Sequence, residues 1–388
     1  FGIWAVMERI FFSETEIKLK EDIGAFLKSE LDPIQNQINQ TKEIPISFIR
    51  KLGKLGYFGP LIPKRYKGTE LGFISHCIMT EELSKRNVAV SVTRTPCILD
   101  GYTLLKQGTE KQKEKYLPKI ATGEKICSIC ITEEGAGSDT AGIKTHAEKE
   151  GDSYILNGSK RFITNAGLAD YYMVWALTDQ KCDPHQAISV FIVEKETPGL
   201  TVDTPYGLLG LNGVKNGVLK FENLKIPAEN LIGQEGNGFQ ILMSTFNLER
   251  ITLSSECNGI SLAALESSKT YARKRIQFGK PIESFQAIRL KIAQMTTQLQ
   301  AARLLTYTAA KLASMNLNFT KEASMAKAFS SKSAVEIALE AVQIHGGDGY
   351  TDQYPVERYL RDAKFFQIGG GTSEIQNLII AREELKES

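Results

Sequence analysis

The segment KICSICIT, residues 125–132, marks the point at which the spacing of apolar residues changes from a helical to a strand-like pattern. Before it, from Glu14 to about Gly123, apolar residues recur three or four positions apart, which predicts amphipathic helices. The first of these runs, SETEIKLKEDIGAFLKSEL, opens with a serine and acidic residues, as helix N-termini do. We therefore predict a helical N-terminal domain at residues 1–124.

Short runs rich in β-branched and aromatic residues follow, and Gly, Asn, Asp and Pro separate them. These runs are ICSICIT, SYILNGSKRFIT, YYMVWAL, AISVFIVEK and VLKFENLKI. Their length and composition predict an all-β domain at residues 125–236. Helical spacing returns after Gly236 and persists, which predicts a C-terminal helical domain at residues 237–388. The predicted fold class is α+β with three domains.

The composition of the 388 residues excludes several classes of protein. Hydrophobic residues make up 42% of the chain, and a net charge of +2 is mixed along it, which argues against a surface for nucleic acid. No apolar run reaches the roughly 18 residues that span a bilayer, and FGIWAVMERIFF is too short for a signal peptide. We therefore expect a cytoplasmic protein without a membrane segment. We also expect a native start at Met7, after a foreign leader at residues 1–6.

Six scattered cysteines fit reduced, buried thiols better than a disulfide framework. They are Cys77, Cys97, Cys127, Cys130, Cys182 and Cys257. Cys127 and Cys130 form a CxxC pair within a predicted strand, where positions three apart point to opposite faces. No second pair or histidine cluster accompanies them, so we interpret the pair as structural rather than redox-active and expect no metal.

Two segments could bind a ligand through backbone groups or cations. TEEGAGSDTAG, residues 132–142, is rich in small residues, and its N–H groups with Ser138 could hold a carbonyl, a phosphate or a flavin edge. Its spacing matches neither a P-loop nor GxGxxG, and a plain loop is the alternative. In RKRIQFGKPIESFQAI, residues 273–288, Arg275 and Gln277 could bind a phosphate. Cations that complement a helix C-terminus are the alternative there.

A third segment, HGGDGYTDQYPVERYLRDAKFFQIGGGTSEIQ, spans residues 345–376 and contains two glycine clusters. Glycine clusters suit close approach of the backbone to an extended ligand. His345 alone would be a structural histidine with its hydrogen bonds satisfied.

In this order, and with helical, β and helical surroundings, the three segments resemble the acyl-CoA dehydrogenase family. The motifs CITEEGAGSD, RxQFGKPI and YPVERYLRDAKFFQIGGGTSEIQ carry the resemblance, which extends from about Glu14 to Glu387. It implies a helical domain, a β-barrel or sandwich domain and a four-helix-bundle domain. It also implies an FAD enzyme, usually a homotetramer, that removes α and β hydrogens from an acyl thioester and passes electrons to a partner flavoprotein.

The resemblance implies a set of cofactor contacts, residue by residue. The flavin ring and its chain would be lined by Ile131, Thr132, Gly137, Ser138, Phe162 and Thr164. The pyrophosphate and adenosine, partly across a subunit interface, would be held by Arg275, Gln277, Phe278, Gln286, Gln343 and Gly347. Thr372 and Glu374 would lie at the other end of the cofactor. The family most often has proline where this chain has Glu134, so the edge of that loop departs from the pattern.

The implied reaction requires a carboxylate beside the substrate. A thioester α-proton is weakly acidic, so a base must contact it while flavin N5 accepts the β-hydride and hydrogen bonds polarise the carbonyl. Many family members place a glutamate immediately before the last Gly-Thr, but this chain has Gly370 there, after Gly369. Either the enzyme is inactive or another carboxylate occupies the same space. The resemblance implies that a flavin ribityl hydroxyl and the Gly370 N–H polarise the carbonyl.

Glu249 is the candidate replacement, because it lies on an apolar stripe of the helix predicted to begin near Gly238. At 100° per residue, the apolar residues within about 60° of it are Leu242, Phe246, Leu253 and Ile260. Burial raises a carboxyl pKa, as a general base needs, whereas an ion pair with Arg250 or a neighbouring helix is the alternative. In the isovaleryl-CoA dehydrogenase branch, which this chain resembles, the base comes from that helix within an LER motif, here residues 248–250.

Glu256 points within about 20° of the same stripe. It could be a rival base, a structural pair, or a recognition group for a cationic or amino-bearing acyl group. The expected substrate-binding set is Ser138, Asn247, Arg250, Leu253, Glu256, Gly369 and Gly370.

We expect FAD-dependent α,β-dehydrogenation of a short, branched or aminoacyl thioester on CoA or a carrier protein. One alternative is a prolyl-carrier-protein dehydrogenase, like those of secondary metabolism. Others are a flavin oxidase or monooxygenase on the same fold, and a non-catalytic flavin-binding protein.

Overall fold

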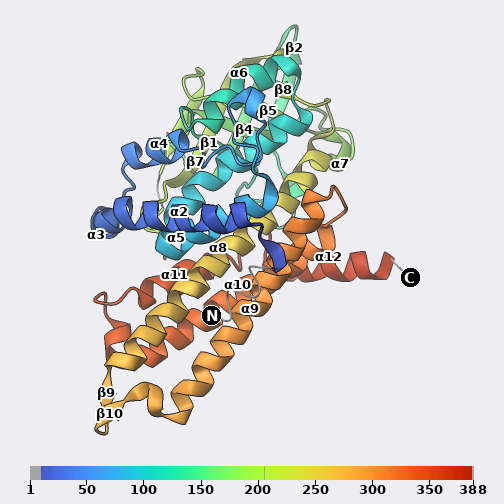
Figure 1. Ribbon diagram of the computed structural model, residues 1–388. Helices are drawn as coiled ribbons and strands as arrows, with labels where there is room; N and C mark the ends of the chain where they lie inside the picture. The colour runs from blue at the N-terminus through green and yellow to red at the C-terminus, as the bar shows by residue number, and fades with distance from the viewer. Residues whose placement is uncertain (1–9, 205, 387–388) are drawn as a thin grey trace.

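The computed structural model describes residues 10–204 and 206–386 (Figure 1). The expected start at Met7 and the expected leader lie outside the described residues. The N-terminal helices are α2 (Glu14–Glu30), α3 (Gln35–Thr41), α4 (Ile46–Lys54), α5 (Gly72–Gln107) and α6 (Glu110–Ala121). The predicted start of the first helix is confirmed, since Ser13 caps α2 in a reciprocal capping box with Glu16. Helix α5 bends at Asn87, whose backbone leaves helical geometry.

The middle of the chain folds into a twisted sheet. Its strands are β1 (Cys127–Cys130), β2 (His146–Glu150), β3 (Ser153–Thr164), β4 (Tyr171–Leu177), β5 (Ile188–Glu194), β6 (Leu200–Asp203), β7 (Asn216–Pro227) and β8 (Leu231–Ile232), with the short helix α7 (Pro184–Ala187) before β5. They run in the order β6-β7-β3-β2-β4-β5-β8, with β1 pairing beside β4. Five of these strands coincide with the five predicted runs, so the predicted β unit is confirmed.

The strands β4 and β5 are buried on both faces of the sheet. Along β4, Met173 and Trp175 pack into the core shared with the N-terminal helices, whereas Tyr172 and Val174 pack into a separate core on the other face. The alternation follows from the two-residue period of a strand. It also separates Cys127 from Cys130, and both are free, buried thiols. The structural interpretation of the CxxC pair therefore agrees with the structure.

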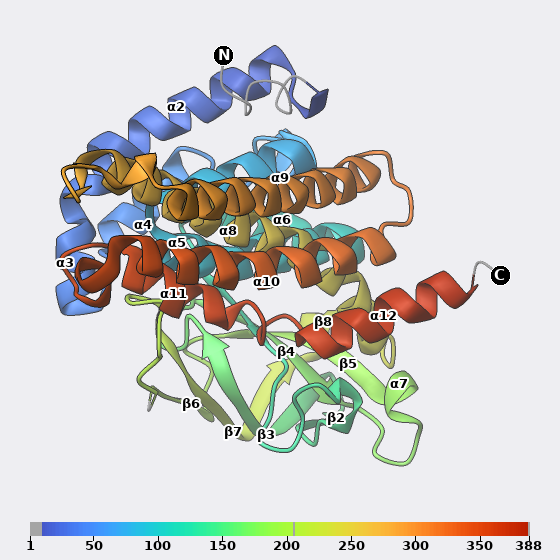
Figure 2. The same ribbon diagram turned by 90° about the horizontal axis from the view of Figure 1, so that it is seen from below.

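The C-terminal part is again helical. Its helices are α8 (Gly238–Lys274), α9 (Gln286–Ser314), α10 (Thr320–His345), α11 (Val356–Phe365) and α12 (Ser373–Lys386), and a hairpin of β9 (Ile276–Gln277) and β10 (Lys280–Pro281) joins α8 to α9. Figures 1 and 2 show α8, α9 and α10 running side by side, with α5 against α8. Helix α8 therefore passes through the centre of the molecule, between the N-terminal helices and the rest of the bundle.

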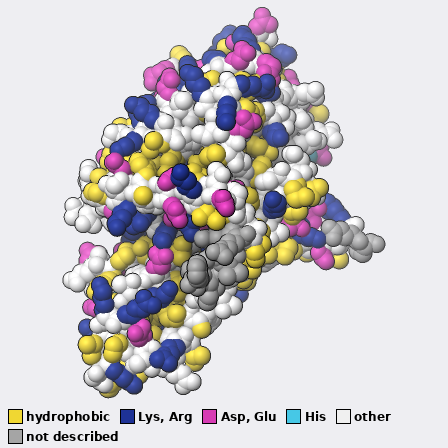
Figure 3. Space-filling model, in the orientation of Figure 1, with side chains coloured by type: hydrophobic (Ala, Val, Ile, Leu, Met, Phe, Trp, Pro, Cys, Tyr) yellow, Lys and Arg dark blue, Asp and Glu magenta, His cyan; other side chains and the backbone are white. Residues whose placement is uncertain are grey.

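The surface agrees with the mixed charge of the sequence. Figure 3 shows basic and acidic side chains interspersed over the visible face. Among the described residues, no helix is long and apolar enough to cross a membrane, and no cluster of His, Cys, Asp and Glu could hold a metal ion.

Candidate active site

The glycine-rich loop between α11 and α12 is held rigidly. The Gly369 N–H donates to the Phe365 carbonyl at 2.9 Å, and Gln376 Nε2 donates to the carbonyls of Gly370 and Gly371 at 3.1 Å each. From α10, Lys327 Nζ donates to the Gly371 carbonyl at 2.5 Å. Gly370 has φ +65°, a conformation that glycine adopts without the cost that a Cβ would add.

The Glu249 carboxyl lies in the space that a side chain at position 370 would need. A Cβ on Gly370 would stand 2.3 Å from Leu253 Cδ1 and 3.3 Å from Glu249 Cδ. Two residues more than a hundred positions apart are thus brought together, as the sequence predicted. Among the described residues, the Gly370 N–H donates to no acceptor. A carboxyl and a backbone N–H without an acceptor among the described residues are therefore neighbours at this loop.

Burial controls the protonation of Glu249. Its Oε2 atom is buried and has no hydrogen-bond partner among the described residues. Burial raises the Glu249 pKa to about 7, against the opposing effects of Arg250 and Lys327. The alternative, an ion pair with Arg250, is not formed, since Arg250 donates instead to Asn247 Oδ1 at 2.6 Å. Glu249 can therefore change its protonation state near neutral pH, as a general base must.

Lys327 is a site residue that the sequence reasoning missed. It is buried on α10, where it links the glycine loop to the surroundings of Glu249. Burial lowers its pKa to about 8, while Cys257 and Glu249 act in the opposite direction. The available signal was a lysine within the small, apolar run SMAKAFS of a predicted helix.

Two turns beyond Glu249 on α8, the Glu256 carboxyl is also buried. Its Oε1 accepts hydrogen bonds from Ser91 Oγ at 2.8 Å and Thr95 Oγ1 at 2.9 Å, both from α5. Its Oε2 has no partner among the described residues. Burial raises the Glu256 pKa to about 7. Ser91 and Thr95 were missed, because only the packing of α5 on α8 brings them there.

The predicted flavin loop is fixed by a buried ion pair. Lys160 Nζ contacts Glu133 Oε1 at 2.7 Å and donates to the Ile131 carbonyl at 2.9 Å. Glu133 in turn accepts from the backbone N–H groups of Lys144 and Thr145. Beyond this anchor the loop opens, since a Cβ on Gly137 would meet no atom within 4 Å. Ser138 and Glu134 are exposed on the same loop, and Thr132 is half-buried.

Phe162 has an unusual backbone for an aromatic residue. It lies where the register between β3 and β7 shifts, with φ +56°, and 51% of its surface is exposed. Arg161 stacks on its ring at 4.2 Å, and the ring of Tyr206 lies 4.9 Å away. A bulky residue held at positive φ costs free energy and is concentrated at functional sites. Phe162 lies beside the open loop, since the Arg161 N–H donates to the Thr132 carbonyl at 2.8 Å, so Phe162, Thr164 and the loop could line a site for a planar ring.

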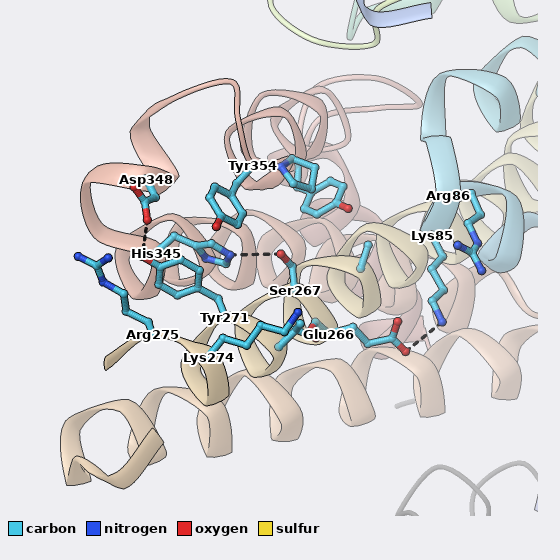
Figure 4. Close-up of a pocket in the computed structure, with 14 residues that line it drawn as sticks. Lys85, Arg86, Glu266, Ser267, Tyr271, Lys274, Arg275, His345, Asp348 and Tyr354 are labelled. Carbon is cyan, nitrogen blue, oxygen red and sulfur yellow. Dashed lines mark hydrogen bonds and ion pairs between the residues drawn. The ribbon is translucent and has the colours of Figure 1, made fainter. Parts of the chain in front are cut away.

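A separate pocket of about 530 Å³ lies at the far end of the bundle (Figure 4). The Tyr271 and His345 rings stack there at 4.3 Å, and Tyr271 Oη donates to Asp348 at 2.6 Å. His345 also contacts Ser267 and the Ala341 carbonyl, so its structural reading agrees with the structure. Arg275 lines this pocket, as the close-up shows.

The other residues predicted for pyrophosphate and adenosine are exposed at this same end of the bundle. They are Gln277, Phe278, Gln286, Gln343 and Gly347. Phe278 is 92% exposed and also has positive φ, +50°. From Glu249 to Arg275, α8 rises about 39 Å at 1.5 Å per residue. The two predicted parts of the cofactor site are therefore not brought together within one chain. Thr372 and Glu374, by contrast, lie at the start of α12 beside Gly370.

Family models match all three parts of the chain. They are the acyl-CoA dehydrogenase N-terminal domain at residues 13–124, middle domain at 128–224 and C-terminal domain at 236–385.

Similar curated proteins match over almost their full length. An acyl-CoA dehydrogenase of Bacillus subtilis is 43% identical, over 95% of this chain and 98% of its own. The caffeyl-CoA reductase-Etf complex subunit CarC of Acetobacterium woodii is 40% identical, over 97% and 100%. The mitochondrial isovaleryl-CoA dehydrogenase of Arabidopsis thaliana is 36% identical, over 97% and 93%.

Solved structures share the whole fold. Butyryl-CoA dehydrogenase from Megasphaera elsdenii superposes with a TM-score of 0.94 at 37% identity, covering 96% of this chain and 99% of that one. The prolyl acyl carrier protein oxidase AnaB superposes with a TM-score of 0.92 at 33% identity, with the same coverage. An FAD complex of PigA superposes with a TM-score of 0.93 at 29% identity, covering 97% and 99%.

Proposed function

Because the chain belongs to the acyl-CoA dehydrogenase family of flavin oxidoreductases, we propose that it dehydrogenates an acyl thioester with Glu249 as the base. The observation that carries this proposal is the Glu249 carboxyl beside Gly370, in the space of the missing side chain. A carboxyl with a buried, unpartnered oxygen and a pKa of about 7 suits abstraction of a weakly acidic α-proton.

FAD fits the residues on and around the loop that the Lys160–Glu133 ion pair anchors. Ile131, Thr132, Gly137 and Ser138 would hold its ring and chain from the anchored loop, with the exposed Phe162 and Thr164 on the neighbouring strand and Thr372 and Glu374 from α12. When bound, FAD supplies the acceptor for the hydride that leaves the β-carbon.

The chain's own groups would orient the thioester. The free N–H of Gly370 would donate to the thioester carbonyl and stabilise the charge that develops as Glu249 takes the α-proton. The loop that carries this N–H is fixed by Lys327 and Gln376, so little reorganisation is needed. Asn247 and Arg250, which lie within one turn of Glu249 and are hydrogen-bonded to each other, would contact the arm that carries the acyl group.

The exposed residues at the end of the bundle point to a second subunit. Because about 39 Å of α8 separates Arg275 from Glu249, the exposed group at the bundle end would hold the pyrophosphate and adenosine of a cofactor bound mainly by another subunit. We propose a homo-oligomer, with a tetramer as the expected state. An electron-transferring flavoprotein is the proposed acceptor, in line with the name of the CarC relative.

The carrier is either CoA or a carrier protein. A carrier-protein substrate with a prolyl group is the second candidate, because AnaB shares the whole fold. An oxidase is the corresponding alternative for the fate of the electrons.

Anaerobic mixing of the FAD-loaded protein with a panel of thioesters tests the proposal. The panel contains isovaleryl-CoA, butyryl-CoA and a prolyl-loaded carrier protein. At least one member should bleach the flavin absorbance within the mixing experiment, and the member that does so most rapidly identifies the carrier. Retained FAD with no bleaching by any member would instead support a non-catalytic flavoprotein. Product formed with stoichiometric oxygen consumption would support an oxidase.

A further inference from the structure

Glu256 is a buried carboxyl with half of its hydrogen-bonding capacity unused. Ser91 and Thr95 both donate to Oε1, whereas Oε2 has no donor among the described residues. An unsatisfied buried polar atom costs on the order of 1–3 kcal/mol, and more when it is charged. Two donors are thus placed on one oxygen while the other is left open, which is the arrangement expected where a ligand supplies the remaining donor.

Stability of the fold does not explain this carboxyl. Two charged neighbours act on its pKa: Glu249 raises it and Arg94 lowers it. The Arg94 guanidinium donates to the Tyr57 carbonyl, to Thr80 Oγ1 and to a nitrogen of His76, but not to Glu256. A buried charge without a partner in direct contact keeps much of its desolvation cost. Glu81 and Arg303 make such a contact at 2.9 Å elsewhere in the helical core.

Glu256 lies in line with the base. Leu253, which lies against Gly370, is between Glu249 and Glu256 on the same stripe of α8. Seven residues of helix rise about 10.5 Å. If the substrate α-carbon lies about 3 Å from the Glu249 carboxyl and a substrate donor lies about 3 Å from the Glu256 carboxyl, then about 4–5 Å of this rise remains between the α-carbon and the donor. That length corresponds to a short acyl group that extends past Leu253.

We propose that Glu256, held by Ser91 and Thr95, forms a subsite for the amino group of an aminoacyl thioester whose nitrogen stands about three bonds from the α-carbon. The inference rests on the proposed function, because Glu249 fixes the position of the α-carbon. An ammonium group would donate a charge-assisted hydrogen bond to Oε2 and so satisfy the oxygen that has no donor among the described residues. A hydrocarbon of the same shape would bury that atom unpaired, so it would be rejected.

Two isosteric pairs of pantetheine thioesters test the subsite in the FAD-loaded protein. Prolyl is compared with cyclopentanecarbonyl, and 4-aminobutyryl with pentanoyl, so that each pair differs in one nitrogen. In the 4-aminobutyryl pair, the kcat/KM of the amino member should exceed that of the hydrocarbon by about 10²-fold or more. The prolyl nitrogen is bonded to the α-carbon and falls short of Glu256, so the prolyl pair should show no such preference. Glu256→Gln should lower this ratio to near one. Glu82→Gln is the matched control, because Glu82 is a buried glutamate that faces α2, and it should leave the ratio unchanged.

Binding gives a readout that does not depend on turnover. Glu249→Gln retains Glu256, and the change in its flavin spectrum on titration should show tighter binding of the preferred amino member than of its hydrocarbon partner. Equal kcat/KM values and equal affinities within the 4-aminobutyryl pair would overturn the subsite and leave the proposed function standing. A preference that survives in Glu256→Gln would have the same consequence. Failure of every thioester to reduce the parent flavin would overturn the proposed function itself.

Discussion

Gly370→Ala should damage both stability and catalysis, for two separable reasons. Alanine at φ +65° costs about 1–2 kcal/mol. Its Cβ would stand 2.3 Å from Leu253 Cδ1, and such overpacking typically adds about 1–3 kcal/mol. The free energy of unfolding, measured by urea denaturation, should therefore fall by about 2–5 kcal/mol. Relief of the clash moves Leu253 and the adjacent Glu249 carboxyl, and a shift of about 1 Å in a reacting group can cost about 10²-fold in rate.

Gly371→Ala is the matched control for this prediction. Gly371 also has positive φ, +86°, but a Cβ there would meet the flexible end of Gln376 at 2.8 Å and neither Leu253 nor Glu249. It should share the backbone cost of about 1–2 kcal/mol and keep its rate of anaerobic flavin reduction within about tenfold of the parent. If Gly370→Ala reduces its flavin as fast as Gly371→Ala does, then the Glu249 carboxyl does not depend on the vacant space at position 370.

Three further outcomes follow from the structure. The kcat/KM for the preferred thioester should rise about tenfold per pH unit below the Glu249 pKa of about 7 and level off above it, because the base acts in its deprotonated form. A flat profile from pH 5.5 to 8.5 would contradict this. Phe162→Ala should weaken FAD binding by about tenfold or more, because it removes a contact worth about 1–3 kcal/mol. Equilibrium dialysis of the apoprotein measures this affinity, and an unchanged affinity would show that Phe162 does not contact FAD. Asp100 is buried without a hydrogen-bond partner among the described residues, and burial raises its pKa well above the usual range, so the stability it confers when protonated is lost as pH rises. Asp100→Asn should therefore unfold at higher urea than the parent at pH 8, and by a smaller margin at pH 5. Equal margins at the two pH values would refute this.

Local patterns were sufficient for most of the fold. The start of α8 at Gly238, the capping box at Ser13 and the five strands all depend on residues close together in the sequence. The bend of α5 at Asn87 was not predicted, because the sequence carries no proline or glycine there. A weaker local signal was present, since Asn87 Oδ1 accepts from the Ala89 N–H as an N-cap side chain does.

The candidate site could be proposed from the sequence where one helix contains the signal. Glu249 stood out because a carboxyl occupied an apolar stripe and because Gly370 lacked the side chain that the resemblance implied. Lys327, Ser91 and Thr95 could not be found in this way, since each reaches the site from another helix. Their positions depend on how α5 and α10 pack on α8, which periodicity does not specify.

Flavin reduction by Glu249→Gln tests the central claim most directly. The glutamine keeps the size of the side chain but cannot accept the α-proton, and loss of a general base typically costs about 10²–10⁴-fold. With the same FAD content as the parent, the variant should show an anaerobic reduction rate lower by that factor for the preferred thioester, while Glu82→Gln matches the parent. A Glu249→Gln variant that is reduced as fast as the parent would show that Glu249 is not the base, and Glu256→Gln would then be the variant to examine.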